Sequence, residues 1–249
     1  MPRLMLSDEH WSKLRVIMRQ QGIYDKPSLR LTVEGILYRM RVGCPRRDLP
    51  SEFGKWNSVY KNFNNWSSNE KLLKIFETLV VQPDLEWPFI DGSIVKAHQH
   101  STGAASDESE AIGKSRAGNT TKIHMAVDAF GLPIAFEITG GEVHDCKIAP
   151  EFIERIPFAE FTVADKGYDS EKVRNQIQQK NSVPVIPRKR NSTIGNDDMD
   201  WCLYKYRHLV ENVFARLKHF RAIATRYDKL KRNYTSMVAL ACGFLWLPM

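Results

Sequence analysis

The sequence of 249 residues is poor in cysteine and lacks the motifs of several common protein classes. Its four cysteines are scattered and form no C-x-x-C pair, so we expect reduced thiols and no zinc ribbon. No apolar run reaches the length of a membrane span, and no signal peptide precedes the first cysteine. No Walker A motif occurs. We therefore expect no membrane contact and no nucleotide cofactor.

Positive charge is present in moderate excess. Lys and Arg total 36 against 29 Asp and Glu, which gives a net charge of +7 and a pI near 9.2. This excess is compatible with a polyanionic partner but does not by itself require one. The length is sufficient for one principal domain and a smaller one.

The first third of the chain has helical periodicity. Ser7 is the predicted N-cap of the first helix, Asn57 that of the fourth, and Pro83 marks the end of a helical domain, residues 1–83. The helices are predicted over 7–20, 28–42, 46–53, 57–66 and 69–81. The third and fourth are joined by a turn at Gly54, which is typical of a helix-turn-helix.

In a helix-turn-helix the second helix enters the DNA major groove. The outward-facing residues of that helix, which would contact phosphates and base edges, are Ser58, Tyr60, Lys61, Asn62 and Asn65. A small helical bundle without DNA contact explains the same pattern equally well.

Residues 84–249 show a different pattern. Apolar segments at 87–97, 121–129, 132–139, 161–165 and 183–187 are predicted strands, and Phe130-Gly131 turns the second and third into a hairpin. A loop is predicted over 98–119, and helices over 150–155, 170–180 and 233–247. Antiparallel strands followed by alternating helices and strands indicate a mixed α/β sheet.

One further helix is predicted over Tyr204–Lys218. Its apolar residues, expected to face the core, are Leu203, Tyr206, Leu209, Val210, Val213, Phe214 and Leu217. Beside this stripe Tyr204, Arg207, Glu211 and Lys218 project within roughly 60° of one another. The alternative is an ordinary surface helix with an i,i+4 ion pair between Arg207 and Glu211.

Two aspartates occupy similar positions at strand ends. Asp91 precedes Gly92 on the first strand, and Asp165 ends the fourth strand shortly before Gly167. Each carboxylate follows an apolar run, and the glycine allows another group to approach closely. Either aspartate alone is explained as a turn former. Two of them together with Glu211 suggest a shared acidic site.

These residues resemble the DDE signature of bacterial insertion-sequence transposases of the IS4/IS5 group, most closely the IS5 family. The resemblance is carried by Asp91-Gly92, by Asp165-Lys166-Gly167-Tyr168 and by the spacing of Tyr204, Arg207, Glu211 and Lys218. The segments 117–128, 140–145 and 223–229 also resemble that family.

The resemblance implies an RNase H-like catalytic core in which Asp91, Asp165 and Glu211 bind divalent metal. Hard carboxylate oxygens suit Mg²⁺ or Mn²⁺, and two ions are expected to assist hydrolysis and then strand transfer. Tyr204, Arg207 and Lys218 would hold phosphates. Double-stranded DNA, as transposon ends and target, a homodimer in a synaptic complex, and a bacterial cytoplasmic location near the nucleoid follow from the same resemblance.

Further basic residues are candidates for backbone contacts with DNA: Lys114, Arg116, Lys122, Arg188, Lys189 and Arg190. The histidines of a possible zinc site, His98, His100, His124 and His144, are better explained as polar loop residues. Asp145 is interpreted as a cap or a supporting group.

Two alternatives to a transposase remain at this point. A transposase-derived protein would bind DNA specifically without cutting it, and an RNase H-like nuclease would cut DNA without joining it.

Overall fold

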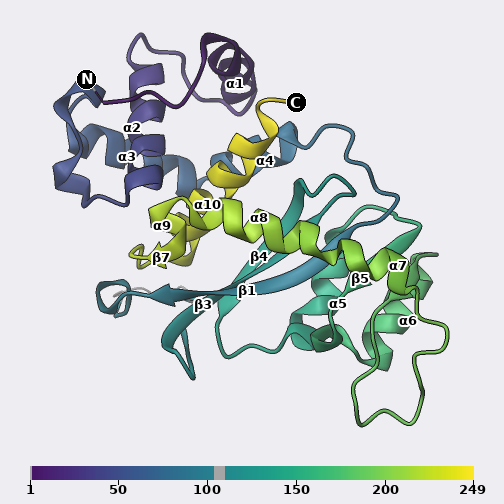
Figure 1. Cartoon of the computed structure of the whole chain (residues 1–249). Helices are drawn as coiled ribbons and strands as arrows, with labels where there is room; N and C mark the ends of the chain where they lie inside the picture. The colour runs from purple at the N-terminus through teal and green to yellow at the C-terminus, as the bar shows by residue number, and fades with distance from the viewer. Residues whose placement is uncertain (1, 104–109) are drawn as a thin grey trace. The chain divides into compact units, whose positions relative to one another are not determined.

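The computed structural model describes residues 2–103 and 110–249 (Figure 1). None of the helices in these two ranges has the length and apolar character that crossing a bilayer requires. Part of the predicted loop 98–119, residues 104–109, lies outside the described residues.

The chain divides into two compact units. The helical unit contains residues 1–81, 97–110 and 217–249, and the sheet unit contains residues 82–96 and 111–216. The first boundary lies between residues 81 and 82, whereas the sequence prediction placed a domain end at residue 83. The C-terminal residues 217–249, however, group with the N-terminal helices and not with the sheet.

The elements of the helical unit are mostly α-helices. They are α1 (Asp8–Gln20), α2 (Leu29–Val42), the 3-10 turns η1 (Arg46–Asp48) and η2 (Ser51–Phe53), α3 (Trp56–Ser68), α4 (Lys71–Leu79), η3 (Gln99–Ser101), α9 (Arg221–Ala224), the short strand β7 (Thr225–Arg226) and α10 (Lys231–Trp246). The all-helical character predicted for the N-terminal region is confirmed.

The ends of the first two helices agree with the sequence. The Ser7 hydroxyl accepts a hydrogen bond from the backbone N–H of His10 at 3.1 Å and caps α1, as predicted. Gly43 adopts a left-handed conformation with φ of 69° and ends α2. This conformation favours glycine because other residues carry a Cβ.

The predicted helix-turn-helix differs from the structure at its first helix. Residues 46–53 form the two 3-10 turns η1 and η2, each of which starts directly after a proline, Pro45 and Pro50. Because proline lacks an N–H, it interrupts a continuous α-helix. The predicted cap Asn57 is also wrong, since α3 starts one residue earlier and Lys55 is its N-cap.

The core of the helical unit joins the two ends of the chain. α10 packs against α4, and Gly243 allows the close contact, because a Cβ there would stand 3.1 Å from the Leu79 side chain. The apolar residues that fill this contact include Leu37, Leu72, Ile75, Phe76, Ala239 and Leu247. This burial explains why residues 217–249 belong to the helical unit.

The elements of the sheet unit are β1 (Phe89–Ala97), β2 (Gly113–Ser115), β3 (Gly118–Val127), β4 (Pro133–Gly140), α5 (Asp145–Arg155), β5 (Phe161–Ala164), η4 (Lys166–Tyr168), α6 (Glu171–Gln179), β6 (Val183–Val185), α7 (Trp201–Tyr204), η5 (Lys205–Arg207) and α8 (His208–Lys218). Two of these bounds differ clearly from the sequence prediction. α5 starts five residues before the predicted Pro150, which lies inside the helix, and β2 lies within the predicted loop.

The sheet is mixed, as predicted. Its strands run in the order β2-β3-β1-β5-β6, and β4 also pairs with β3. β3 is antiparallel to β1 and β4, whereas β5 is parallel to both β1 and β6. The β3–β4 hairpin turns at Gly131, where the Asp128 carboxylate accepts hydrogen bonds from two backbone N–H groups of the turn.

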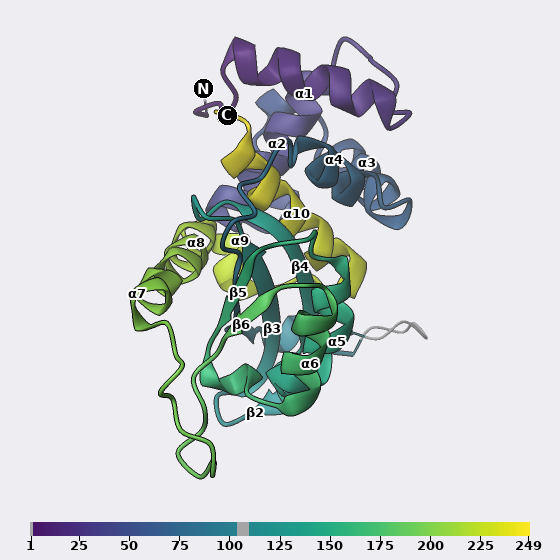
Figure 2. The ribbon, with the colours of Figure 1, turned by 90° about the vertical axis from the view of Figure 1, so that its right-hand side faces the viewer.

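Helices cover both faces of this sheet (Figure 2). α5 and α6 lie side by side on one face, and α7 and α8 lie on the other. Apolar side chains of β1, β3 and β5, such as Phe89, Met125 and Val163, are fully buried between these layers. The turn η5, directly before α8, lies against β1 through Arg207, whose guanidinium contacts Asp91.

The predicted continuous helix over Tyr204–Lys218 is wrong. The segment contains α7, the 3-10 turn η5 and α8 in succession, and α7 is capped by the Asp200 carboxylate, which accepts from the Leu203 N–H. Because a 3-10 turn is wound more tightly, it changes which side chains share a face. Tyr206, predicted to be buried, is 49% exposed and stacks on Trp87 instead.

A candidate carboxylate centre at the strand ends

Asp91 and Asp165 lie on neighbouring parallel strands. In the register of β1 and β5, Ile90 pairs with Ala164, and each aspartate is the next residue along its chain. Because parallel strands run in the same direction, the two aspartates come to the same level of the sheet, where β5 ends and β1 continues. The sequence pointed to both residues through their similar settings, and the family resemblance implied that they act together.

Arg207 connects Asp91 with Glu211. Its Nη1 donates to Asp91 Oδ2 at 2.7 Å, and its Nη2 donates to Glu211 Oε1. The Asp91 side chain is 18% exposed and that of Glu211 is 53% exposed. One guanidinium therefore holds two carboxylates together, one largely buried on β1 and one exposed on α8.

Burial and charge act against ionisation of Asp91. Burial raises the pKa of Asp91, and the charge of Asp165 raises it further, whereas the Gly92 N–H and Arg207 lower it. The result is a pKa above the usual value for aspartate. A cation that approaches Asp91 would therefore stabilise the ionised form of its carboxyl group.

Asp145, the first residue of α5, lies against the glycines that follow both aspartates. A Cβ on Gly92 would stand 2.7 Å from Asp145 Oδ1, and one on Gly167 would stand 3.3 Å from Asp145 Oδ2. The sequence singled out both glycines but assigned Asp145 only a capping or supporting role. The N-cap of α5 is His144 and not Asp145.

Two basic residues of β3 hold Asp145 in this position. Lys122 Nζ lies 3.3 Å from Asp145 Oδ1, and His124 Nδ1 lies 3.4 Å from the same oxygen. Burial raises the pKa of Asp145, but the contacts with His124 and Lys122 outweigh it and keep the pKa below the usual value. Asp145 is therefore an ionised neighbour of Asp91 and Asp165.

Tyr168 is a buried phenol whose ionisation is affected by the charges of the three aspartates. Tyr168 is 1% exposed, and its hydroxyl has no hydrogen-bond partner among residues 2–103 and 110–249. Burial raises its pKa well above the usual value, and the charges of Asp145, Asp91 and Asp165 raise it further. The phenol thus stays protonated as a donor, although sequence reasoning gave it no role.

The centre has the ligand chemistry of a divalent-metal site. Carboxylate oxygens are the donors that Mg²⁺ and Mn²⁺ prefer. In the described part of the chain, no three His, Cys, Asp or Glu side chains are gathered closely enough to hold an ion. In this structure the Arg207 guanidinium supplies the positive charge that Asp91 and Glu211 share. The residue types of the centre fit a divalent metal, although two of its carboxylates are paired with an arginine here.

Two models of known protein families match this chain. Residues 89–246 match the family model described as "Transposase DDE domain", and residues 6–76 match "Putative transposase of IS4/5 family". The chain belongs to the DDE transposase family. Its mixed sheet is the RNase H-like core that the resemblance implied, and members of this family depend on divalent metal.

Two relatives from insertion sequences match about half of this chain. "Putative transposase for insertion sequence element IS6501" of Brucella ovis is 36% identical over 129 residues, which cover 51% of this chain and 98% of the relative. "Putative transposase for insertion sequence element IS402" of Burkholderia cepacia is 30% identical, and the match covers 51% of this chain and 63% of the relative.

A solved structure of lower similarity is the piggyBac transposase synaptic complex with hairpin DNA. It aligns with a TM-score of 0.43 and 9% identity, over 75% of this chain and 50% of the piggyBac chain.

Tyr204 and Lys218, two other residues of the transposase signature, belong to different units. Tyr204 lies beside Arg207, whose guanidinium carbon is 6.0 Å from the Tyr204 ring centre, and burial raises the pKa of the phenol. Lys218, at the end of α8, belongs to the helical unit, and burial lowers its pKa. The structure therefore gathers Tyr204, Arg207 and Glu211 in the sheet unit.

The predicted DNA-contacting residues of α3 lie mainly at the surface. Ser58, Lys61 and Asn65 are exposed, whereas Tyr60 and Asn62 are partly buried. The Asn62 side chain donates to the Ser58 carbonyl within the helix at 3.0 Å.

The basic residues around β2 and β3 separate into two groups. Lys114 and Arg116 are exposed, but Lys122 is buried and donates to the Val143 carbonyl at 2.9 Å in addition to contacting Asp145. The structure thus directs Lys122 inward to the carboxylate centre, away from a surface position on the DNA backbone.

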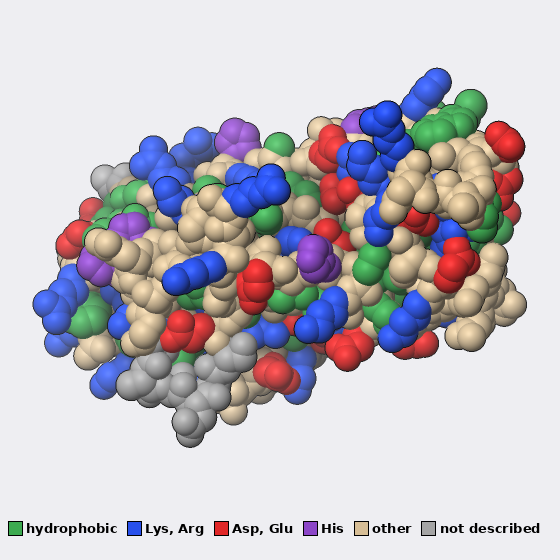
Figure 3. All heavy atoms as spheres, turned by 90° about the horizontal axis from the view of Figure 1, so that it is seen from below, with side chains coloured by type: hydrophobic (Ala, Val, Ile, Leu, Met, Phe, Trp, Pro, Cys, Tyr) green, Lys and Arg blue, Asp and Glu red, His purple; other side chains and the backbone are tan. Residues whose placement is uncertain are grey.

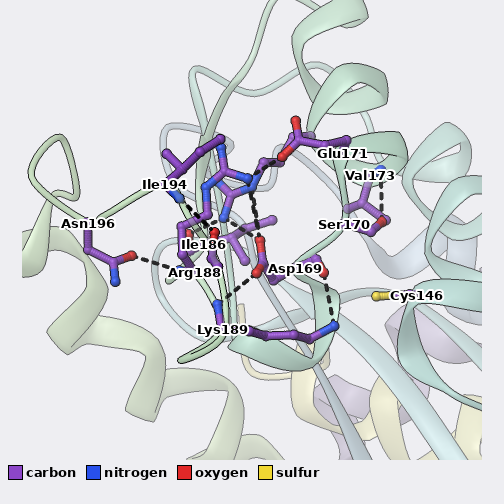
Figure 4. Close-up of polar contacts among 12 residues, drawn as sticks. Cys146, Asp169, Ser170, Glu171, Val173, Ile186, Arg188, Lys189, Ile194 and Asn196 are labelled. Carbon is purple, nitrogen blue, oxygen red and sulfur yellow. Dashed lines mark hydrogen bonds and ion pairs between the residues drawn. The ribbon is translucent and has the colours of Figure 1, made fainter.

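The run Arg188-Lys189-Arg190 is largely engaged in contacts within the protein (Figure 4). Arg188 pairs with Glu171, and the Lys189 N–H and ammonium donate to the Asp169 carboxylate and carbonyl at 2.8 and 3.0 Å. These contacts fasten the loop after β6 to the start of α6. Arg190 is exposed.

The histidines do not form a common site. His98 and His100 lie in the helical unit, where the two rings are 4.8 Å apart. His124 is buried in β3 with its Nε2 2.9 Å from Thr139 Oγ1, and His144 is exposed.

The net positive charge is not concentrated on the face drawn in Figure 3. Lysine and arginine side chains there are interspersed with aspartates and glutamates. The net charge alone therefore does not mark a DNA-binding face on this side of the transposase.

Proposed function

We propose that this chain is the transposase of a bacterial insertion sequence, which binds terminal inverted repeats and catalyses DNA cleavage and strand transfer with Asp91, Asp165 and Glu211 as metal ligands. The observation that carries the proposal is the meeting of these carboxylates. Asp91 on β1 and Asp165, directly after β5, are neighbours on adjacent parallel strands, and Arg207 links Asp91 to Glu211. Membership of the DDE family supports the same reaction class.

The proposed cofactor is Mg²⁺ or Mn²⁺, with two ions held by Asp91, Asp165 and Glu211. When bound, such ions activate a water or a hydroxyl and stabilise the leaving oxygen of an in-line displacement at phosphorus. The raised pKa of Asp91 supports this assignment, because burial beside Asp165 makes an additional cation favourable there.

Arg207 and Tyr204 are proposed to hold the phosphates that flank the scissile bond. The Arg207 guanidinium already presents two donors to two separate carboxylates, and the same fork can bind a phosphate in bidentate fashion. The Tyr204 phenol remains protonated because burial raises its pKa, so its hydroxyl can donate to a phosphate oxygen. Lys218 is proposed to contact a neighbouring phosphate.

Asp145, Lys122 and His124 are proposed to position the centre. Asp145 contacts the two glycine positions next to Asp91 and Asp165 while Lys122 and His124 hold it from β3. This arrangement fixes the backbone that carries the two metal-binding aspartates, in the way that outer groups commonly orient metal ligands.

The proposed substrate is double-stranded DNA, both as transposon ends and as target. Exposed residues of α3, the basic residues Lys114 and Arg116 beside β2, and Arg190 are proposed backbone contacts. Joining two ends requires that they be held together, so we propose a homodimer in a synaptic complex, acting in the bacterial cytoplasm.

The deciding experiment measures cleavage and strand transfer on DNA that carries the element's own ends, with Mg²⁺ or Mn²⁺. Glu211→Gln is compared with the wild type, and Glu151→Gln on α5 serves as a matched control because Glu151 is an exposed helical glutamate of the same unit. We expect metal-dependent nicks and joined products from the wild type and the control, and neither from Glu211→Gln.

Three other outcomes separate the alternatives. Specific binding without cutting by any of the proteins would identify a binding-only relative of transposases. Cutting without joined products would identify a nuclease. Cutting that survives Glu211→Gln would place the active site elsewhere.

A further inference from the structure

The helical unit contains a pocket of about 1300 Å³. Its walls come from the segment that contains η1 and the start of α3, from residues 222–233, and from His100 and Gly103. Pockets for small molecules are typically about 300–1,000 Å³. This cavity is therefore large enough for a polymer segment.

The charge that lines the pocket is positive. Five cationic side chains, Arg39, Arg46, Arg47, Lys229 and Arg232, face two carboxylates, Asp48 and Asp228. Asp228 is only 2% exposed and lies 3.2 Å from Arg39 and 3.3 Å from Arg46. Since one of the two carboxylates is thus already engaged within the wall, the pocket retains an excess of positive charge and favours an anionic ligand.

Arg39 has a donor without a partner in this wall. Its Nε is buried and has no hydrogen-bond acceptor among the residues that the structure describes, although one of its terminal nitrogens reaches Asp228. A buried donor of this kind is costly unless an acceptor reaches it.

Aromatic rings lie beside two of these cations. The Arg46 guanidinium carbon is 3.8 Å from the centre of the Tyr60 ring, and that of Arg47 is 5.8 Å from the Trp56 ring. In the wall formed by residues 222–233, Tyr227 is 48% exposed and stacks on His98 with 4.4 Å between the ring centres. Trp56 is also accessible, with 36% of its surface exposed.

Cations that contact phosphates together with rings that stack on bases are typical of sites for single-stranded nucleic acid. A base-paired duplex would use the cations but not the rings, because its bases are already stacked inside the helix. An acidic peptide would also leave the exposed rings without a matching group. The lining therefore fits an unpaired DNA strand better than either.

We propose that this pocket binds an unpaired segment of a DNA strand, with Arg47 and Lys229 contacting phosphates and Tyr227 stacking on a base. The inference rests on the proposed function, which makes DNA the substrate. The proposed site combines two segments, residues 39–60 and 222–233, that lie far apart in the chain.

The charge of the pocket is tested by fluorescence anisotropy with the full chain. The probes are a labelled duplex with a single-stranded thymidine tail and the same duplex without a tail. The double variant Arg47→Gln/Lys229→Gln is compared with Arg19→Gln/Lys74→Gln, which removes the same charge from exposed residues of the same unit outside the pocket.

Loss of two phosphate contacts to a single strand lowers the salt-dependence slope by about 1.4. We expect that decrease for the pocket variant on the tailed probe only, while the control behaves as the wild type. An equal effect of both double variants, or no effect of either, would overturn the proposal.

The stacking contact is tested at Tyr227. Tyr227→Leu removes the ring, and we expect affinity for the tailed duplex to fall about fivefold to a hundredfold. Tyr227→Phe keeps the ring and should bind as the wild type does. Equal weakening of the tailed and blunt probes by Tyr227→Leu would show that the pocket holds duplex backbone and would contradict the proposal.

Failure of this inference is distinguishable from failure of the proposed function. A wild type that cuts element ends while the pocket variants bind the tail normally would overturn the pocket alone. A wild type that binds the tail through Tyr227 but never cuts would support the pocket and overturn the catalytic proposal.

Discussion

Each unit of the molecule contains a group of arginines and carboxylates, and the two groups have opposite composition. In the sheet unit one cation, Arg207, is shared by two carboxylates, Asp91 and Glu211. In the helical unit one carboxylate, Asp228, is shared by two cations, Arg39 and Arg46. The first group has an excess of negative charge and the second an excess of positive charge.

This difference indicates which ligand each group stabilises. Asp91 lies beside Asp165 and Asp145, so an additional cation is favourable in the sheet unit. Arg47, Lys229 and Arg232 line the same pocket as the Asp228 group, so an additional anion is favourable in the helical unit. The same residue types therefore suit metal binding in one unit and phosphate binding in the other, depending on which sign is in excess.

The largest expected effect is at the centre of the acidic group. Asp165→Asn should reduce metal-dependent cleavage by more than about a hundredfold, because even loss of outer groups around metal ligands costs about 10- to 100-fold. Binding to end DNA should remain near the wild-type level, and Asp198→Asn in an exposed loop should change neither. Cleavage and anisotropy are measured on the same preparations. An equal loss of cutting and binding would argue against a metal-ligand role.

The second effect is on the stability of the helical unit, where Asp228 is paired with Arg39 and Arg46. Asp228→Asn should lower the free energy of unfolding by about 3 kcal/mol, because it leaves two arginines against a buried neutral group. Asp25→Asn breaks the more exposed pair with Arg15 and should cost much less, because solvent screens that pair. Urea denaturation gives both values, and similar values for the two variants would mean that the Asp228 group is not a buried network.

The third effect is at Arg207, which pairs with Asp91 and Glu211 and is proposed to bind a phosphate. Arg207→Ala should reduce cleavage roughly tenfold or more through loss of a bidentate phosphate contact. It should also strengthen stabilisation by Mn²⁺ in thermal melts, because the guanidinium no longer competes for Asp91 and Glu211. A large drop in melting temperature without metal would point to a structural ion pair instead.

A smaller effect is expected in the pH profile. Burial raises the pKa of Asp91, and Arg207 opposes that rise, so removal of Arg207 raises the pKa further. Because protons compete with metal for the carboxylate, the acid limb of residual cleavage by Arg207→Ala should move to higher pH than in the wild type. A limb that moves to lower pH would contradict the assignment of Asp91 to the metal.

The smallest effect is at the surface of α3. Lys61→Ala should weaken binding to end DNA and reduce its salt-dependence slope by about 1, because one phosphate contact is lost. Lys74→Ala on α4 is the matched control, since Lys74 is also exposed in the helical unit. An unchanged slope in Lys61→Ala would exclude this face from the DNA interface.

Local features of the chain were predictable where the interactions that create them are local. Ser7 and Ser170 cap the helices that follow them, and the turn after Asp128 closes the predicted hairpin. Asp91 and Asp165 were recognised as charges that follow apolar strands. Such caps, turns and alternating patterns depend on residues a few positions apart, so the sequence determines them directly.

Features that depend on distant segments were not predictable in this way. The position of Asp145 beside Gly92 and Gly167, and the break between α7 and α8, required the packed sheet unit. The basic pocket required residues 39–60 and 222–233 to be folded together, by the contacts of α2 with α9 and of α3 with α10.

The sequence by itself therefore determined the residue types of the acidic centre, the strands that carry two of its aspartates, and the family. Tertiary structure decided which cation those carboxylates share, which other side chains support them, and that a second group of opposite charge exists. The physical reason is that hydrogen-bonded caps and strand alternation act over short stretches of chain, whereas charge pairing in a folded protein depends on burial that brings distant residues together.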